Sequence, residues 1–171
     1  MSASTSSPAL NERPRAGFFR RLGAWVYDLL IVVAILLLAT LIALFLQAGL
    51  VATGLLTLPE GTEPSEFLRT NLIFQAYLFS CLFGFFIWFW RRGGQTAGMK
   101  TWRLKLQSLD GQRLTHRQCI VRLLTCFFGL GNILLLVPGL KKRSLQDICS
   151  NTEIIVLSKE ENKHINWKGY L

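Results

Sequence analysis

Two long runs of apolar residues dominate the hydrophobic pattern of the chain. The first runs from Leu22 to Leu46 and contains a single charged residue, Asp28. At roughly 1.5 Å per residue its roughly 25 residues make about 37 Å of helix, enough to cross a hydrocarbon core of about 30 Å. The second run, Leu72 to Trp90, has roughly 19 residues and just reaches across the same thickness. The pattern predicts two membrane-spanning helices.

A third apolar stretch, Ile120 to Leu140, leaves two alternatives open. Arg122 lies inside it, and glycine, asparagine and proline interrupt its second half. The stretch either crosses the membrane or turns back near Gly129 to Asn132. We favour a re-entrant hairpin, because a full crossing would place Lys141 to Arg143 on the outer side, against the positive-inside rule.

The positions of the basic residues predict the orientation. Of the 19 lysines and arginines, only Arg69 lies between the two long runs. The connection around Glu60 is therefore expected outside, with the N-terminus and residues 91–117 in the cytoplasm. This predicts a multi-pass protein of the cell inner membrane. Residues 1–14 are rich in serine and have no apolar period, so we expect a disordered cytosolic tail there.

The cytoplasmic segment after the second run has a strand pattern. Thr101 to Leu106 alternates apolar and basic residues with a period of two, which predicts a half-buried strand. Asp110-Gly111 then gives a tight-turn signal, so we expect a small cytoplasmic β-hairpin. Thr152 to Leu157 is a second β-branched run that could pair with the first strand. An amphipathic segment at the membrane interface is the alternative.

Composition and charge agree with a membrane protein. Hydrophobic residues make up 51% of the chain and charged residues only 17%, and the net charge is +9. The basic residues cluster beside the apolar runs, where anionic lipids at the cytoplasmic face attract each by about 1 kcal/mol. No nucleic-acid motif accompanies the charge, so we expect no nucleic-acid partner.

Motifs for catalysis or metal binding are weak. Gly93 to Lys100 has the glycine spacing of a phosphate-binding loop, but Met99 occupies the lysine position. The four cysteines form no CxxC pair, and His116 with Cys119 is an isolated pair that lacks enough ligands for zinc. We expect no metal, no cofactor and no enzymatic activity.

Three motifs stand out: Arg21-Leu-Gly-Ala-Trp-Val-Tyr-Asp28 opens the first span, Gly94-Gln-Thr-Ala-Gly98 precedes the Asp110-Gly111 turn, and Arg143-Ser-Leu-Gln-Asp147 precedes Thr152. Together they resemble the RDD family, which is named for one arginine and two aspartates. The resemblance covers about Pro14 to Leu157, and Ser150-Asn151 departs from the Ala-Gly that the family often has. The apolar runs predict an all-α membrane bundle with two full transmembrane helices plus a third apolar helix or re-entrant hairpin, with a small cytoplasmic β-hairpin. We expect an RDD-like membrane domain over residues 15–157 and a C-terminal tail over 158–171. Most members have no defined activity, and a few are linked to sodium/proton exchange. The resemblance implies signature residues Arg21, Asp28 and Asp147, with Arg122 at the start of the third stretch and a cytoplasmic turn motif of Gly94, Thr96 and Gly98.

Helical spacing limits how the signature residues can pair. Arg21 and Asp28 lie two turns apart on one face, about 10.5 Å, so they cannot bridge each other. We expect Asp147 to dock near Arg21. We expect the partner of Asp28 to be a basic residue, Arg122 in preference to Arg21. The alternative for Asp147 is a helix-capping role, because Ser144 to Asp147 matches a capping box.

Two classes of function fit these residues. In the first, Asp28 is a proton- or cation-binding carboxylate in a proton-coupled cation transporter. In the second, the same charges hold together a non-catalytic membrane scaffold or assembly subunit. Because two or three helices rarely enclose a pathway alone, we expect a homo-oligomer or a larger membrane complex, with Gly84 and Ser80 as a small-residue contact surface.

Overall fold

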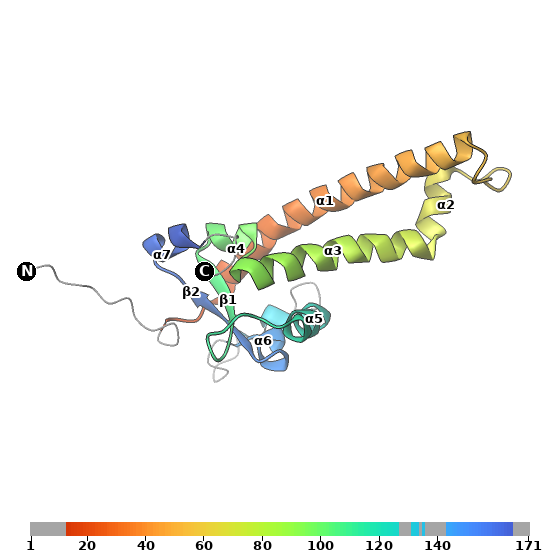
Figure 1. Ribbon diagram of the computed structural model, residues 1–171. Helices are drawn as coiled ribbons and strands as arrows, with labels where there is room; N and C mark the ends of the chain where they lie inside the picture. The colour runs from red at the N-terminus through yellow and green to blue at the C-terminus, as the bar shows by residue number, and fades with distance from the viewer. Residues whose placement is uncertain (1–12, 127–130, 134, 136–142, 166–171) are drawn as a thin grey trace, which may run out of the picture. The chain divides into compact units, whose positions relative to one another are not determined.

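The structure is a computed structural model that describes residues 13–126, 131–133, 135 and 143–165 (Figure 1). The chain divides into two compact units. Unit 1 contains the described residues of 1–28 and 86–171, and unit 2 is Leu29–Phe85. In chain order the elements are α1 (Phe18–Ala52), α2 (Pro64–Thr70), α3 (Leu72–Gly93), α4 (Ala97–Thr101), β1 (Leu104–Ser108), α5 (His116–Thr125), α6 (Leu145–Cys149), β2 (Thr152–Val156) and α7 (Lys159–His164).

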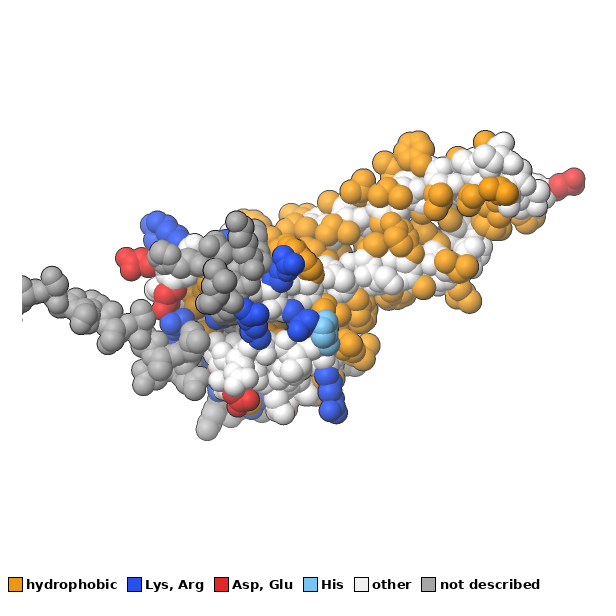
Figure 2. Space-filling view, viewed as in Figure 1, with side chains coloured by type: hydrophobic (Ala, Val, Ile, Leu, Met, Phe, Trp, Pro, Cys, Tyr) orange, Lys and Arg blue, Asp and Glu red, His pale blue; other side chains and the backbone are white. Residues whose placement is uncertain are grey.

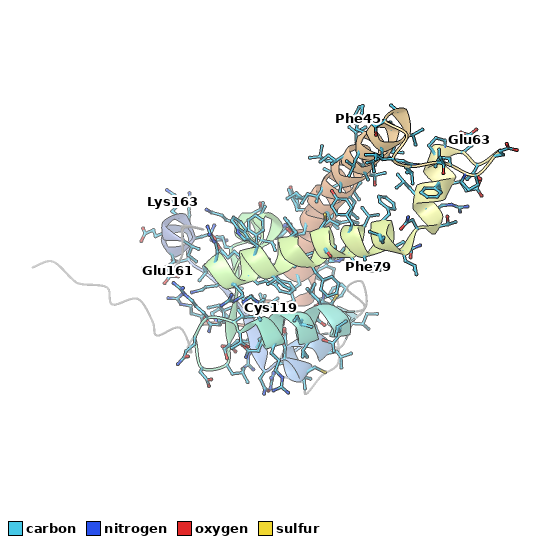
Figure 3. All side chains as sticks on the ribbon, turned by 45° about the vertical axis from the view of Figure 1, so that its right-hand side comes forward. Phe45, Glu63, Phe79, Cys119, Glu161 and Lys163 are labelled. Carbon is cyan, nitrogen blue, oxygen red and sulfur yellow. The ribbon has the colours of Figure 1, made fainter. Side chains whose placement is uncertain are left out.

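The helices α1 and α3 confirm the two long apolar helices predicted from the sequence. They have 35 and 22 residues, and both are long and apolar enough to span a membrane. Hydrophobic side chains cover much of their visible surface in Figure 2. Phe45 on α1 and Phe79 on α3, labelled in Figure 3, are 71% and 60% exposed. A helix that is apolar on its outward faces needs apolar surroundings.

Local signals set the ends of these helices. After α1 the chain turns at Gly54, whose φ of +72° lies in the left-handed region that glycine tolerates. At the start of α3, the Asn71 side chain accepts a hydrogen bond from the Ile73 N–H at 2.8 Å and so caps the first turn. After α3 the chain leaves the helix at Gly94, with φ +65°.

In unit 1 the sheet pairs β1 with β2 in antiparallel register, with Leu104 opposite Val156 and Ser108 opposite Thr152. The sequence predicted that the run Thr152 to Leu157 could pair with the first strand, and β2 lies within that run. The predicted β-hairpin is wrong for this part of the chain. The turn at Gly111 exists, since its N–H donates to the Ser108 carbonyl at 2.9 Å, but the chain then leads into α5.

The strand β1 is also more buried than its alternating pattern predicted. Every residue of β1 is buried, including Lys105, because other segments cover both faces. Residues 14–16 run along the other edge of β2: the Ala16 N–H donates to the Ile154 carbonyl at 2.9 Å, and the Val156 N–H donates to the Pro14 carbonyl at 3.0 Å. The sheet therefore has no hairpin, and the start of the chain covers one of its edges.

The core of unit 1 joins residues that are distant in sequence. Its buried members come from α1 and the residues before it, the end of α3, α4, both strands, and α5 with the loop before it. They are Ala16, Ala24, Trp90, Met99, Leu104, Leu106, Leu114, Cys119 and Ile154. Burying these side chains is the main stabilising term for the unit. It brings the signature residues of the sequence into one folded body.

The third apolar stretch is described only in part. Its first residues belong to α5, a 10-residue helix that begins with a capping box formed by Thr115 and Gln118. Residues 131–133 and 135 form short 3₁₀ turns. Residues 127–130, 134 and 136–142 lie outside the described part, so the re-entrant hairpin stays a prediction. The expected N-terminal tail also lies almost wholly outside it, whereas the expected C-terminal tail contains α7.

Candidate functional site

Asp147 is at the centre of a buried cluster of charged residues, which we call the charge cluster (Arg21, Arg122 and Asp147). Asp147 is the third residue of α6 and is fully buried. Its Oδ2 accepts hydrogen bonds from Arg21 Nη1 at 2.5 Å and from the Ser144 N–H at 3.1 Å, and its Oδ1 accepts one from Arg122 Nη1 at 2.7 Å. The expected docking of Asp147 near Arg21 is confirmed. The capping role is present as well, so the two alternatives for Asp147 occur together.

Both arginines of the charge cluster also bind neighbouring elements. Arg21 donates from Nε to the Ala16 carbonyl at 3.1 Å and from Nη1 to Ser144 Oγ at 3.1 Å. Arg122 donates to Thr152 Oγ1 at 2.6 Å, and its guanidinium lies 5.7 Å from the centre of the Trp90 ring. The charge cluster thereby connects the start of α1 with α5, α6 and β2.

The two guanidinium groups determine the protonation state of Asp147. Burial by itself raises the pKa of this carboxyl, but Arg122 and Arg21, together with the Ser144 N–H, lower it more, to about 2. Asp147 is therefore ionised at every physiological pH. Loss of this charge would leave two buried guanidinium groups without their carboxylate.

Asp28 has different partners from those we expected. Its Oδ2 accepts a hydrogen bond from Thr96 Oγ1 at 2.5 Å, and its Oδ1 accepts one from the Gly98 N–H at 2.9 Å. The expected pair of Asp28 with Arg122 is wrong, because the Arg122 guanidinium binds Asp147 and Thr152. Asp28 is 5% exposed and is held by neutral donors.

The turn motif of Gly94, Thr96 and Gly98 is the partner of Asp28. Thr96 caps α4, since its side chain also accepts the Met99 N–H at 3.2 Å. A Cβ atom on Gly98 would collide with the Ala24 carbonyl and would lie 2.8 Å from an Asp28 carboxylate oxygen. Only glycine lets this backbone approach α1 closely enough to donate to Asp28. The sequence singled out the motif but gave no role to it; the Thr-x-Gly spacing at a helix start was the available signal.

A polar contact that the sequence did not indicate lies next to this motif. Gln95 is fully buried, and its Nε2 donates to the Leu104 carbonyl at 2.7 Å and to Asn162 Oδ1 at 3.0 Å. Asn162 in turn donates to the Lys100 carbonyl at 2.9 Å. These bonds attach α7 to the segment around α4. Gln95 and Asn162 are uncharged and belong to no hydrophobic repeat, so the sequence alone could not identify their contact.

Metal and thiol chemistry find little support in the described residues. Among them, no group of three or more histidine, cysteine, aspartate or glutamate side chains could hold a metal ion. Burial raises the pKa of the Cys119 thiol to about 11, although Arg91 and Arg122 oppose the shift. The Cys119 thiol thus stays protonated and unreactive at neutral pH.

The sequence comparisons agree with the resemblance stated above. A family model described as RDD family matches residues 15–151, a range that contains Asp28, the charge cluster and the turn motif. Searches of curated proteins and of solved structures found no match.

Proposed function

This chain belongs to the RDD family, and we propose that it is a multi-pass protein of the cell inner membrane, with a cytoplasmic N-terminus, that works as a non-catalytic assembly subunit. In this proposal α1 and α3 cross the bilayer, and unit 1 is a preformed module at the cytoplasmic face. The family gives no defined activity, so the proposal rests on what the buried charged residues do in the structure.

The bonding of Asp147 carries the proposal. Both of its carboxylate oxygens accept hydrogen bonds from arginines, and all three side chains of the charge cluster are buried. A carrier site must release its ligand and bind it again. Exchange at Asp147 would leave two buried guanidinium groups without their carboxylate, and breaking a buried ion pair typically costs about 3 to 5 kcal/mol. These bonds suit a permanent structural support better than a transport site.

Exposed basic and aromatic residues at the end of α3 suit contact with anionic lipids at the cytoplasmic face. The Arg92 guanidinium lies 5.0 Å from the centre of the Trp88 ring, and Arg91 lies beside it in sequence. Lysine and arginine side chains, blue in Figure 2, gather over the visible face of unit 1. Such residues are attracted to anionic lipid headgroups and anchor helix ends at the interface.

Helix α3 also offers a surface for self-association. A Cβ atom on Gly84 meets nothing within 4 Å, and Ser80, one turn away, is exposed and donates its hydroxyl to the Ala76 carbonyl of its own helix at 2.7 Å. Small residues let two helices approach closely in a membrane. We therefore propose a homo-oligomer or a larger membrane complex, with this face of α3 as a contact.

Proton-coupled cation transport is the second candidate, and the bonding of Asp28 favours it. The donors to Asp28 are a hydroxyl and a backbone N–H, so protonation of Asp28 would not leave a buried cation unpaired. A carboxylate held in this way on a membrane-spanning helix is able to exchange a proton. Asp28 is the residue on which a transport mechanism would depend.

Ion flux in liposomes separates the two candidates. The purified protein is reconstituted with an internal pH dye, and sodium or potassium pulses are applied to the unmodified protein and to Asp28→Asn. An assembly subunit gives the same dye response as protein-free liposomes, in both forms. A cation-driven pH change that Asp28→Asn abolishes, while Glu63→Gln in the connection before α2 retains it, would contradict the assembly proposal and establish transport.

A further inference from the structure

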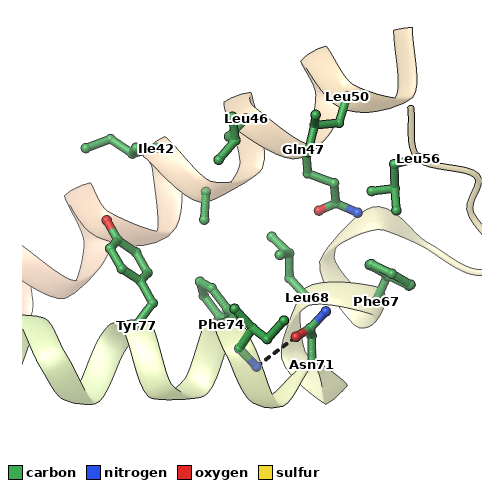
Figure 4. A pocket seen from close by; sticks show the side chains of 12 residues that line it. Ile42, Leu46, Gln47, Leu50, Leu56, Phe67, Leu68, Asn71, Phe74 and Tyr77 are labelled. Atoms are coloured by element: carbon green, nitrogen blue, oxygen red, sulfur yellow. Dashed lines mark hydrogen bonds between the residues drawn. The ribbon is translucent and has the colours of Figure 1, made fainter. Parts of the chain in front are cut away.

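Unit 2 contains a cavity of about 400 Å³ between the last third of α1, the segment around α2 and the first turns of α3 (Figure 4). Ligand-binding pockets in proteins have volumes of about 300 to 1,000 Å³, so this cavity is large enough for a small molecule. Leucine, isoleucine and phenylalanine form most of its wall, and its polar members are Gln47, Asn71 and Tyr77. No side chain that lines it is charged.

Gln47 is the unusual member of this wall. The residue is 4% exposed, and neither its Nε2 nor its Oε1 has a hydrogen-bond partner among the described residues. Figure 4 shows its amide directed into the cavity, between α1 and the α2 segment. Leaving a buried amide unpaired is unfavourable, because the group loses its hydrogen bonds to water without replacing them. An amide kept in this position suggests a ligand that completes its bonds.

The other polar side chains do not satisfy Gln47. Asn71 uses its Oδ1 to accept the Ile73 N–H and so caps α3. Tyr77 is 36% exposed and lies one helical turn beyond Phe74. The lining therefore offers one buried amide, with a donor and an acceptor, on a wall that is apolar apart from Asn71 and Tyr77.

The place of Gln47 along α1 indicates how a ligand would arrive. Gln47 directly follows Leu46, the last residue of the first apolar run. In the proposed orientation this level is the outer boundary of the hydrocarbon core. A molecule reaching the cavity from the lipid must be apolar over most of its surface and neutral at its polar end.

We propose that this cavity binds a neutral, lipid-soluble molecule whose oxygen-bearing end hydrogen bonds to the Gln47 amide. The carboxamide Nε2 donates to a carbonyl of the ligand, and Oε1 accepts from a hydroxyl where the ligand has one. Two sources share this chemistry, namely a glycerol ester lipid with one acyl chain and a quinone or quinol with a short side chain. Charged lipid headgroups do not fit the lining, because it has no ionised group to pair with them.

Radioligand binding to the full-length protein in phosphatidylcholine nanodiscs tests the proposal. The two labelled probes are glycerol monolaurate and a short-chain benzoquinone, and unlabelled tetradecane is the apolar competitor. We expect saturable binding of at least one probe, roughly tenfold weaker in Gln47→Leu, which corresponds to the loss of about one hydrogen bond. Whichever probe binds more tightly identifies the source of the ligand.

Two further variants keep the test decisive. Thr40→Val is the matched control, because the Thr40 hydroxyl donates to the Leu36 carbonyl within α1 and Thr40 does not line the cavity. The affinity of this variant for the probes should equal that of the unmodified protein. Leu46→Trp places a larger side chain in the wall and should abolish binding. Absence of saturable binding, equal affinity in Gln47→Leu, or displacement by tetradecane as effective as by the unlabelled probe would each overturn the proposal.

Discussion

Among single residues, the buried aspartates Asp28 and Asp147 differ in the kind of donor that holds them. Arg21 and Arg122 bind Asp147, whereas Thr96 and Gly98 bind Asp28. The sequence predicted the first arrangement in part, since helical spacing left Arg21 in need of a partner. The sequence predicted the wrong partner for Asp28, because charge balance suggests a cation for every buried carboxylate. A hydroxyl and a backbone N–H carry no charge and so gave no such signal.

The close approach of Gly98 to α1 predicts a large effect of a single methyl group. Gly98→Ala should lower the free energy of unfolding by about 3 kcal/mol, because the added Cβ collides with Ala24 and displaces the hydrogen bond to Asp28. Urea unfolding in detergent measures this loss. The matched control is Gly49→Ala on α1, where a Cβ meets open space. That variant should be neutral or more stable by up to about 1 kcal/mol, as alanine favours helix more than glycine does. Equal effects of the two substitutions would show that Gly98 is not a close contact.

The pKa of Asp147 predicts how stability depends on acid. Its folded value of about 2 lies below the ordinary value of 3.8, so Asp147 binds a proton more readily in the unfolded chain. Its contribution is therefore fully present above about pH 4 and is lost as the pH falls toward 2. The loss amounts to about 2 kcal/mol. Asp147→Asn should remove this part of the acid sensitivity in urea titrations between pH 5 and pH 2, whereas Asp110→Asn at an exposed turn should leave it in place.

Among the elements, the long helices were predictable and the sheet was not. Apolar length alone identifies α1 and α3, because a run of about 20 apolar residues is typical of a helix long enough to span a membrane. The sheet depended on a partner about 50 residues away. A turn at Asp110-Gly111 did form, but Thr115 begins the capping box of α5, so too few residues remain for a second strand. The β-branched run of β2 then paired with β1, and tertiary context overrode the local turn signal.

The segment of residues 14–16 makes a testable contribution to the sheet. Ala16→Pro removes the N–H that donates to the Ile154 carbonyl, and proline is poorly tolerated where a strand bond is needed. We expect faster hydrogen–deuterium exchange across β2 and its partner β1. Gly17→Ala is the control, because a Cβ there meets nothing within 4 Å. Unchanged exchange in Ala16→Pro would show that this edge does not stabilise the sheet.

For the whole molecule, the arrangement of charges predicts the topology. A fluorescent-protein fusion at Leu171 should be bright and an alkaline phosphatase fusion there inactive, since a re-entrant third stretch leaves both termini in the cytoplasm. Alkaline phosphatase inserted at Gly61, in the connection before α2, should be active. An active phosphatase at Leu171 would mean that residues 120–140 cross the membrane.

The central claim is that the charge cluster fixes the fold of unit 1 and that Arg122 acts through Asp147. Two double-mutant cycles sharing Arg122→Gln test it in one urea-unfolding experiment in detergent. With Asp147→Asn, the losses should be strongly non-additive, with a coupling of about 1.5 kcal/mol or more, because removing Asp147 leaves Arg122 buried without its carboxylate, and removing Arg122 takes one of two guanidinium partners from Asp147. With Asp28→Asn, the losses should add to within about 0.5 kcal/mol, because Asp28 is held by Thr96 and Gly98. Additivity in the first cycle, or strong coupling in the second, would contradict the account.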